Sequence, residues 1–147
     1  MLEIMKDVAF NVFGKKPQLD RLINTHHNFC QCERCVFVDP KTGLQVEEDL
    51  WVTRKGATGA REGQAGLIPG SMGTGSYVVE GKGMKEAWSS CSHGAGRVMS
   101  RTKAFQMVKQ HEFEATLKGI ACDSDEGLRD EAPQAYKDLE EVMAHQV

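Results

Sequence analysis

The sequence predicts an α+β domain, and three observations lead to this class. Segments near both ends of the chain show helical periodicity, residues 35–48 hold two strand-like segments around a turn, and residues 56–83 hold short apolar pieces separated by glycines. The 147 residues suffice for one domain with a modest core. We therefore expect a single domain over residues 1–147, with short strands, glycine-rich loops and helices packed on them.

The N-terminal segment predicts two short helices, over residues 3–13 and residues 17–25. The second segment places Leu19, Leu22 and Ile23 on one helical face.

A hairpin is expected next. Residues 35–39 (CVFVD) and 44–48 (LQVEE) favour strands around the turn PKTG. Residues 49–56 (DLWVTRKG) are expected to extend the second strand.

The middle of the chain predicts loops and short strands, because nine of the 15 glycines lie between residues 56 and 83, with apolar pieces such as GLIPG and SYVVEG among them. Residues 97–111 then favour a helix whose buried stripe consists of Val98, Ala104, Phe105 and Val108.

Near the C-terminus, ACDSDEGLRDEAP is expected to form an acidic loop. The following QAYKDLEEVMAHQ favours a helix that presents Tyr136, Leu139 and Met143.

The composition is typical of a globular protein outside the membrane. Charged residues make up 27% of the chain, the mean hydropathy is −0.43, and no apolar run is long enough to span a membrane. The N-terminus does not resemble a secretion signal, and five cysteines are an odd number that fits a reducing compartment. These features predict a cytoplasmic location.

Charge is distributed unevenly along the chain. The net charge is −3, which argues against a generally basic nucleic-acid binder. Residues 54–109, however, hold nine basic and three acidic side chains, a net charge of +6. This basic middle indicates a local anion site, although solvated charged faces would give the same pattern.

The stretch HHNFCQCERC, residues 26–35, permits two interpretations. Cys30, Cys32 and Cys35 with a nearby histidine could form a small zinc-binding module. On a strand, however, Cys30 and Cys32 would share a face and Cys35 would point away. The other interpretation is a single catalytic-metal ligand, His26 or His27.

Two further stretches could bind anions. VTRKGAT (52–58) places Arg54 and Lys55 at the end of a strand, where a phosphate could bind. IPGSMGTGSY (68–77) combines glycines and serines whose backbone N–H groups could face inward as an anion nest. An ordinary charged surface and a tight strand connection remain the alternatives.

The stretch SSCSHGAGRVMSR (89–101) combines a histidine with small residues and two arginines. A histidine can attack phosphorus when one ring nitrogen is free and the other is tied by a hydrogen bond. A helix beginning near Gly96 would direct its positive end to the same place and set Arg97 and Arg101 on one face. Without further context, His93 could equally be an ordinary histidine in a glycine turn.

These motifs, in the order HHN, VTRKGAT, IPGSMGTGSY and SHGAGRVMSR, followed by DEAPQAYKDLEEVM, resemble the RtcB family of GTP-dependent RNA-splicing ligases. The resemblance extends from about His26 to Met143 and matches only the C-terminal portion of a family member. It implies the corresponding portion of an RtcB-type mixed α/β fold. It also implies an enzyme of tRNA splicing or RNA repair that joins an RNA 3′-phosphate or 2′,3′-cyclic phosphate to a 5′-hydroxyl.

The resemblance also implies roles for individual residues. His93 resembles the histidine that attacks GTP and becomes guanylylated, and His27 resembles a ligand of the catalytic Mn²⁺. Asn28 would lie beside the metal, near RNA. The resemblance assigns nucleotide contacts to Ser71, Ser76, Ala95, Gly96 and Tyr136, and RNA or nucleotide phosphate contacts to Arg97 and Arg101.

The family's other metal ligands have no counterpart before His26, and the family's terminal lysine-glycine ending is absent. We therefore expect a fragment that is inactive alone, needs a complementary N-terminal half and tends to self-associate. An inactive remnant or interaction module that keeps the fold is the alternative, besides the zinc-binding module.

Overall fold

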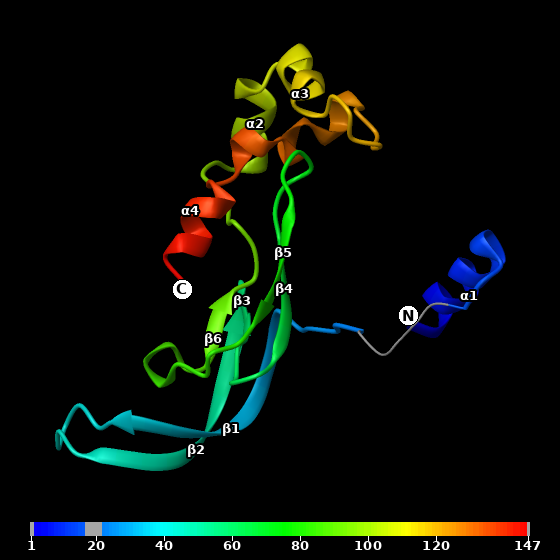
Figure 1. The fold of residues 1–147 in the computed structure, drawn as a ribbon. Coiled ribbons are helices and arrows are strands. Elements are labelled where there is room, and N and C mark those ends of the chain that lie inside the picture. The colour runs from blue at the N-terminus through cyan, green and yellow to red at the C-terminus, as the bar shows by residue number, and fades with distance from the viewer. Residues whose placement is uncertain (1, 17–21, 147) are drawn as a thin grey trace.

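The computed structural model describes residues 2–16 and 22–146 and has the predicted α+β class (Figure 1). Its strands form three separate two-stranded antiparallel sheets, β1–β2, β3–β6 and β4–β5. The helices α2 and α3 lie at the end of the β4–β5 ribbon that is far from the β1–β2 hairpin (Figure 1). The elements are α1 (Leu2–Phe13), β1 (Asn28–Val38), β2 (Gln45–Lys55), β3 (Ala57–Gly59), β4 (Ala65–Pro69), β5 (Ser76–Glu80), η1 (Lys85–Ala87), β6 (Ser90–Ser92), α2 (Arg101–Met107), α3 (Gln110–Thr116), η2 (Glu126–Glu131), η3 (Pro133–Ala135) and α4 (Leu139–Ala144).

The N-terminal helix is confirmed, and the second predicted helix is not. Residues 17–21, which include Leu19, lie outside the described residues. Residues 22–25 are irregular, so the predicted helix over 17–25 is wrong for its described part. Helix α1 lies apart from the other elements (Figure 1).

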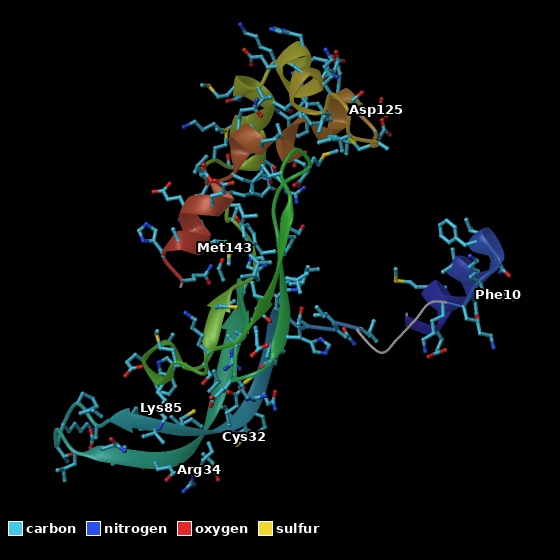
Figure 2. All side chains as sticks on the ribbon, viewed as in Figure 1. Phe10, Cys32, Arg34, Lys85, Asp125 and Met143 are labelled. Atoms are coloured by element: carbon cyan, nitrogen blue, oxygen red, sulfur yellow. The ribbon has the colours of Figure 1, made fainter. Side chains whose placement is uncertain are left out.

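The predicted hairpin is confirmed, including the extension of its second strand, and its first strand is longer than expected. The ladder runs from Val38 opposite Gln45 to Asn28 opposite Lys55. Asp39 organises the turn, because its carboxylate accepts hydrogen bonds from the Lys41 N–H at 2.8 Å and from the Thr42 hydroxyl at 3.0 Å. These bonds hold the pKa of Asp39 below its usual range. The first strand exceeds its predicted segment because the polar residues of CQCER continue the ladder on an exposed hairpin (Figure 2).

The glycine-rich middle forms short strands and loops, as predicted. At Gly81 the chain passes so close to the backbone at Ala60 and Arg61 that an added Cβ would lie 2.3 Å from the Arg61 carbonyl oxygen. Only glycine permits this approach.

The predicted helix over 97–111 is broken into two and starts later. Helix α2 begins at Arg101, with the Ser100 hydroxyl accepting the N–H of Lys103 at 3.2 Å, and ends at Met107. Helix α3 begins after Lys109. The start is delayed because Gly96 has a left-handed φ of +74° and Arg97 forms an extended bridge. Of the predicted stripe, Ala104 and Val108 are buried, whereas Val98 and Phe105 are exposed.

The C-terminal helix is also shorter than predicted. Tyr136 is extended, and Asp138 caps α4 by accepting the N–H groups of Glu140 and Glu141. Tyr136, Leu139 and Met143 nevertheless belong to one apolar cluster. The predicted acidic loop contains the 3-10 helix η2, in which Asp130 is buried.

Two small apolar clusters form the core. One fills the helical end and contains Val108, Phe113, Leu117 and Ala132, with Met72 and Leu128 packed against it. The other joins β4 to α4 and contains Ile68, Ala95 and Leu139, with Val79, Cys91, Tyr136 and Met143 at its border. Within residues 2–16 and 22–146, no helix has the length and apolar character that a membrane crossing requires.

Candidate active site

Two histidines from distant parts of the chain lie against each other. His27 ends the irregular stretch before β1, and His93 follows the last residue of β6. Their rings stack with centroids 5.3 Å apart and planes inclined by 8°. The structure therefore brings together the residue expected to bind manganese and the residue expected to attack GTP.

The short strand β3 holds both histidine-bearing segments. The buried Thr58 donates its hydroxyl to the carbonyl of His26 at 3.2 Å, and its backbone pairs with Cys91 of β6. Gly56, with φ of +71°, turns the chain between β2 and β3, where an added Cβ would lie 3.7 Å from the His93 ring. This left-handed conformation favours glycine. The VTRKGAT motif thus forms the turn beside the histidines.

The backbone around His93 is fixed by its neighbours. The N–H of Ser92 donates to the side-chain oxygen of Gln146 at 2.6 Å, and the Ser92 hydroxyl donates to the carbonyl of Gly94. Gly94 lies against β4, since an added Cβ would lie 3.2 Å from the Pro69 carbonyl oxygen. Within the described part of the chain, no hydrogen bond reaches the His93 ring. The hydrogen bond expected at one of its ring nitrogens is therefore not found there.

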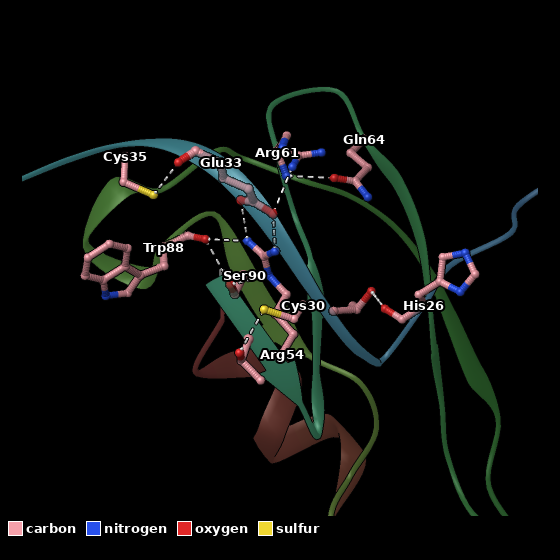
Figure 3. A network of polar contacts seen from close by, with 11 residues as sticks. His26, Cys30, Glu33, Cys35, Arg54, Arg61, Gln64, Trp88 and Ser90 are labelled. Atoms are coloured by element: carbon pink, nitrogen blue, oxygen red, sulfur yellow. Dashed lines mark hydrogen bonds and ion pairs between the residues drawn. The ribbon is translucent and has the colours of Figure 1, made fainter. Parts of the chain in front are cut away.

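The two cations of VTRKGAT, Arg54 and Lys55, have different surroundings at the end of the hairpin. Asn28 and Lys55 are paired at the end of the β1–β2 ladder, and both are exposed. Arg54 is only 3% exposed and forms an ion pair with Glu33 (Figure 3). The prediction of two free cations is therefore wrong for Arg54. Alternation along the strand could have revealed this, because successive side chains point to opposite faces.

A pocket of about 770 Å³ lies between the β4–β5 loop and the segment that leads into α4. Three predicted nucleotide contacts, Ser71, Ser76 and Tyr136, line it. Lys137 and Glu140 lie in the same wall. The pocket thus combines hydroxyl groups, charged groups and an aromatic ring, which suits a polar ligand with a flat base.

The loop at the pocket mouth is tightly closed. The N–H of Ser71 donates to the Thr74 hydroxyl at 2.7 Å, and the N–H of Thr74 donates to the Ser71 carbonyl at 3.2 Å. An added Cβ on Gly70 would lie 2.3 Å from the Gly75 carbonyl oxygen, and one on Gly73 would lie 2.5 Å from Pro133. The loop therefore forms a tight strand connection, which was the alternative to an anion nest. The N–H groups of Ser71 and Thr74 are already bonded within the loop and are not available to an anion.

Ala95 and Gly96 connect His93 to this pocket. Ala95 is buried against Ile68 and Leu139. Gly96 is exposed, and its carbonyl accepts the N–H of Lys137 at 2.9 Å. Both residues therefore fix the strand end against the pocket wall, and neither is among the residues that line the pocket.

The guanidinium of Arg97 is already bound to other groups of the protein. It lies 4.9 Å from the centre of the Tyr136 ring and donates to the Tyr136 hydroxyl at 3.0 Å, to the Met99 carbonyl at 3.1 Å and to the Asp130 carbonyl. The prediction that Arg97 lies on a helix face with Arg101 is wrong, because the helix begins at Arg101.

Arg101 is more accessible. Its side chain is 72% exposed and pairs with Asp130 at 3.1 Å and with Glu131 at 3.2 Å. The guanidinium of Arg101 therefore remains open to solvent on one side, and a phosphate can reach it more easily than the enclosed Arg97.

Tyr136 is held at its hydroxyl. That hydroxyl donates to Glu131 and accepts from Arg97. Burial, together with the bond to Glu131, raises the pKa of Tyr136 above its ordinary value. The phenol is therefore neutral at physiological pH, and its ring has a fixed orientation in the pocket wall.

The cysteines are not gathered into one site. Cys30 and Cys32 are exposed, whereas Cys35 is buried, as expected for their spacing on a strand. Among residues 2–16 and 22–146, no three histidine, cysteine or acidic side chains come close enough to hold a metal. The described residues therefore fit neither the zinc module nor a complete manganese site made by this chain alone.

The sequence did not predict one cluster of charged and polar side chains around the buried Arg54. Arg54, Glu33, Arg61 and Ser90 meet beneath the hairpin (Figure 3). Three of these four residues carry formal charges, and the sequence offers no local signal that they converge. The alternation of the hairpin strands is the only pattern that could have placed Glu33 and Arg54 on one face.

Comparisons with known proteins agree with the motif pattern. The family model described as tRNA-splicing ligase RtcB matches residues 1–147. An RNA-splicing ligase RtcB1 from a strain of Escherichia coli is 46% identical, with 90% of this chain aligned to 30% of that protein.

Two further relatives have the same relation to this chain. The RNA-splicing ligase RtcB of Escherichia coli K12 is 47% identical over 84% of this chain and 28% of its own length. The tRNA-splicing ligase RtcB of Pyrobaculum aerophilum is 39% identical over 97% of this chain and 34% of its own length. The chain thus spans about a third of the length of the curated relatives that it matches.

Proposed function

The chain belongs to the RtcB family of tRNA-splicing ligases, and from this membership we propose that it is the nucleotide-bearing part of a GTP-dependent RNA ligase. The observation that supports the proposal best is the stacked pair His27 and His93, joined through Ala95 and Gly96 to the pocket with Ser71, Ser76 and Tyr136. A candidate nucleophile and a candidate metal ligand therefore lie side by side, and residues 94–96 connect the nucleophile to a pocket large enough for a nucleotide.

The first proposed step is attack by a neutral ring nitrogen of His93 on the α-phosphorus of GTP. A nitrogen–phosphorus bond forms, the bond from this phosphorus to the pyrophosphate oxygen breaks, and the ring proton is released to solvent. The pocket near Tyr136 would hold the guanosine, and Lys55 and Arg101 are exposed cations that could contact the phosphates, besides Lys137 in the pocket wall.

The remaining steps use RNA ends. An oxygen of the RNA 3′-phosphate attacks the same phosphorus, the bond to His93 breaks, and the ring regains a proton. The 5′-hydroxyl of the second RNA end then attacks the 3′-phosphate, GMP leaves, and the hydroxyl proton is released as the phosphodiester forms. A 2′,3′-cyclic phosphate must first be opened by water to enter this sequence. Asn28, exposed beside His27, would contact RNA.

Manganese would act as a Lewis acid on the phosphoryl groups when bound. His27 is the one predicted ligand in this chain, and a single imidazole holds a metal weakly. We propose that the other ligands come from a complementary polypeptide that corresponds to the rest of a full-length relative.

That polypeptide would also cover apolar surface. Trp51 is 74% exposed, Val78 71% and Phe13 75%. Exposed side chains of this size favour association, so we expect the isolated chain to self-associate until its complement is present. Light scattering after gel filtration tests this expectation, and a stable monomer would contradict it.

The experiment for the function combines the chain with the N-terminal part of an RtcB relative, radiolabelled GTP and Mn²⁺. We expect a covalent GMP adduct that disappears in His93→Ala and persists in His111→Ala, because His111 is an exposed histidine of α3 far from the stack. RNA with 3′-phosphate and 5′-hydroxyl ends should then be joined. Folded protein that forms no adduct with the complement present would contradict the proposal and favour a module that keeps only the fold.

A further inference from the structure

A buried arginine links the two strands that lead to the stacked histidines. Arg54 of β2 donates from Nη2 to Glu33 of β1 at 2.9 Å and pairs with the same carboxylate through Nη1 (Figure 3). It also donates from Nε to the Ser90 hydroxyl at 2.9 Å and from Nη2 to the Trp88 carbonyl at 2.9 Å. Arg61 contacts the same carboxylate at 2.9 Å.

These partners belong to different parts of the site. Glu33 lies on β1, the strand that begins directly after His27. Ser90 begins β6, the strand that ends directly before His93. Arg54 precedes Lys55, the residue that pairs with Asn28 in the ladder. The guanidinium therefore ties the His27-bearing hairpin to the His93-bearing strand.

The turn that Arg54 contacts is strained. Trp88 and Ser89 have left-handed φ values of 54° and 46°. Such conformations are unfavourable for residues with a side chain and persist when surrounding contacts hold them. The bond from Arg54 to the Trp88 carbonyl, together with the Ser90 hydroxyl that donates to the same carbonyl at 2.9 Å, is such a contact.

The geometry of the pair points to a role in fixing the orientation of the two strands. Burying two charges is costly, and a buried ion pair replaced by apolar side chains often leaves stability unchanged. The bidentate fork, however, fixes the orientation of both partners. Glu33 has its side chain 8% exposed and Arg54 2%, so water does not loosen this geometry.

We propose that Arg54 and Glu33 are positioning residues that set the distance and stacking of His27 and His93. The inference deepens the proposed function, since the stack is the part of the site that would transfer GMP. Neither residue touches the nucleotide pocket. Their loss should therefore slow His93 guanylylation while leaving the affinity of the pocket for GTP unchanged.

The first test measures the stack itself, without nucleotide or metal. In the labelled full chain, nuclear Overhauser contacts between the ring protons of His27 and His93 report the stacking. We expect them to disappear in Glu33→Gln and in Arg54→Met and to weaken in the milder Ser90→Ala, while the resonances of His111 and of α3 stay in place.

The matched control is Arg34→Met, because Arg34 makes an exposed ion pair with Glu47 at 3.1 Å and Asp49 at 3.3 Å on the same hairpin. This variant should keep the histidine contacts. If Arg54→Met fails to fold, the histidine contacts in Glu33→Gln and Ser90→Ala test the proposal instead. An unchanged histidine contact in both folded variants would overturn the proposal.

The second test uses the guanylylation mixture described above. Displacing a reacting group by about 1 Å can cost on the order of 100-fold in rate, so we expect Glu33→Gln to lower the rate of adduct formation about 10–100-fold with an unchanged KM for GTP. A normal rate overturns the positioning role. If the unaltered chain forms no adduct, the proposed function fails, whereas the loss of histidine contacts in the variants would still stand.

Discussion

The helical end of the molecule and the histidine-bearing strands are held together by different kinds of contact. At the helical end, Phe113 is fully buried with Val108 and Leu117 around it. Between the strands that lead to the histidines lies the buried ion pair of Arg54 with Glu33. Apolar packing tolerates small shifts of its members, whereas directional bonds specify position. The region proposed to do chemistry is therefore the one whose geometry depends on charge.

The strongest test of this difference is Phe113→Ala. Removing a fully buried phenylalanine ring costs about 3–5 kcal/mol of unfolding free energy. We expect hydrogen exchange to quicken throughout α2 and α3 and to change little in β1 and β2.

Its control is Phe105→Ala on the neighbouring helix, where the side chain is 36% exposed and the effect should be smaller. Equal loss of protection in the helices and in the hairpin would mean that the two regions unfold as one unit.

A smaller effect is expected from Gly70→Ala, in the loop that joins the pocket to β4. The new methyl group would lie 2.3 Å from the Gly75 carbonyl oxygen and from the Thr74 hydroxyl, so the loop must open at a cost of about 1–3 kcal/mol. Thermal unfolding measures the cost.

Gly75→Ala is the matched control in the same loop, since an added Cβ there meets no atom within 4 Å. If both variants unfold at the same temperature, the close packing of this loop does not contribute to the stability of the fold.

Acid should loosen the histidine region first. The hydrogen bonds and charge of Arg54, with Arg61, hold the pKa of Glu33 below its ordinary value of 4.5 despite burial. Because the folded-state pKa is lowered, the pair stabilises the fold above pH 4.5, and this contribution is lost as the pH falls below that value toward the folded-state pKa.

We therefore expect amide protection in β1 and β2 to fall below pH 4.5 before protection in α3 does. Glu33→Gln should remove most of this difference in pH response. A hairpin as acid-resistant as the helices would argue against a charge-dependent geometry.

The smallest effect is expected from Tyr136→Phe, at the border between the two regions. The change deletes the hydroxyl that bonds Arg97 and Glu131, and the net worth of such a bond is about 1 kcal/mol. Urea unfolding measures it, with Tyr77→Phe as the control because Tyr77 is exposed. No difference between the two variants would show that Arg97 and Glu131 find other partners.

Local patterns predicted local structure well. The hairpin followed from alternating residues and the PKTG turn, and the glycine-rich middle followed from composition. The helix start was misjudged because apolar spacing from Val98 onward fits a helix, whereas the left-handed Gly96 and the bridge from Arg97 to Tyr136 depend on residues far along the chain.

The candidate site shows the same limit. Motif resemblance selected His27 and His93, but no spacing within the sequence predicts that their rings stack. Arg54 was read as a phosphate-binding cation because the charge of its neighbour Lys55 was considered without the strand alternation that turns Arg54 inward. Long-range contacts such as the hydrogen bond from Arg54 to Ser90 produce no periodic pattern in the sequence.

The contact between Gln146 and Ser92 has a practical consequence for labelling. The amide oxygen of Gln146 receives the N–H of the residue directly before His93, so a tag or fluorophore attached next to Gln146 would disturb the proposed nucleophile. Helix α1 lies apart from strands β3 and β6 (Figure 1) and is the better place for an affinity tag.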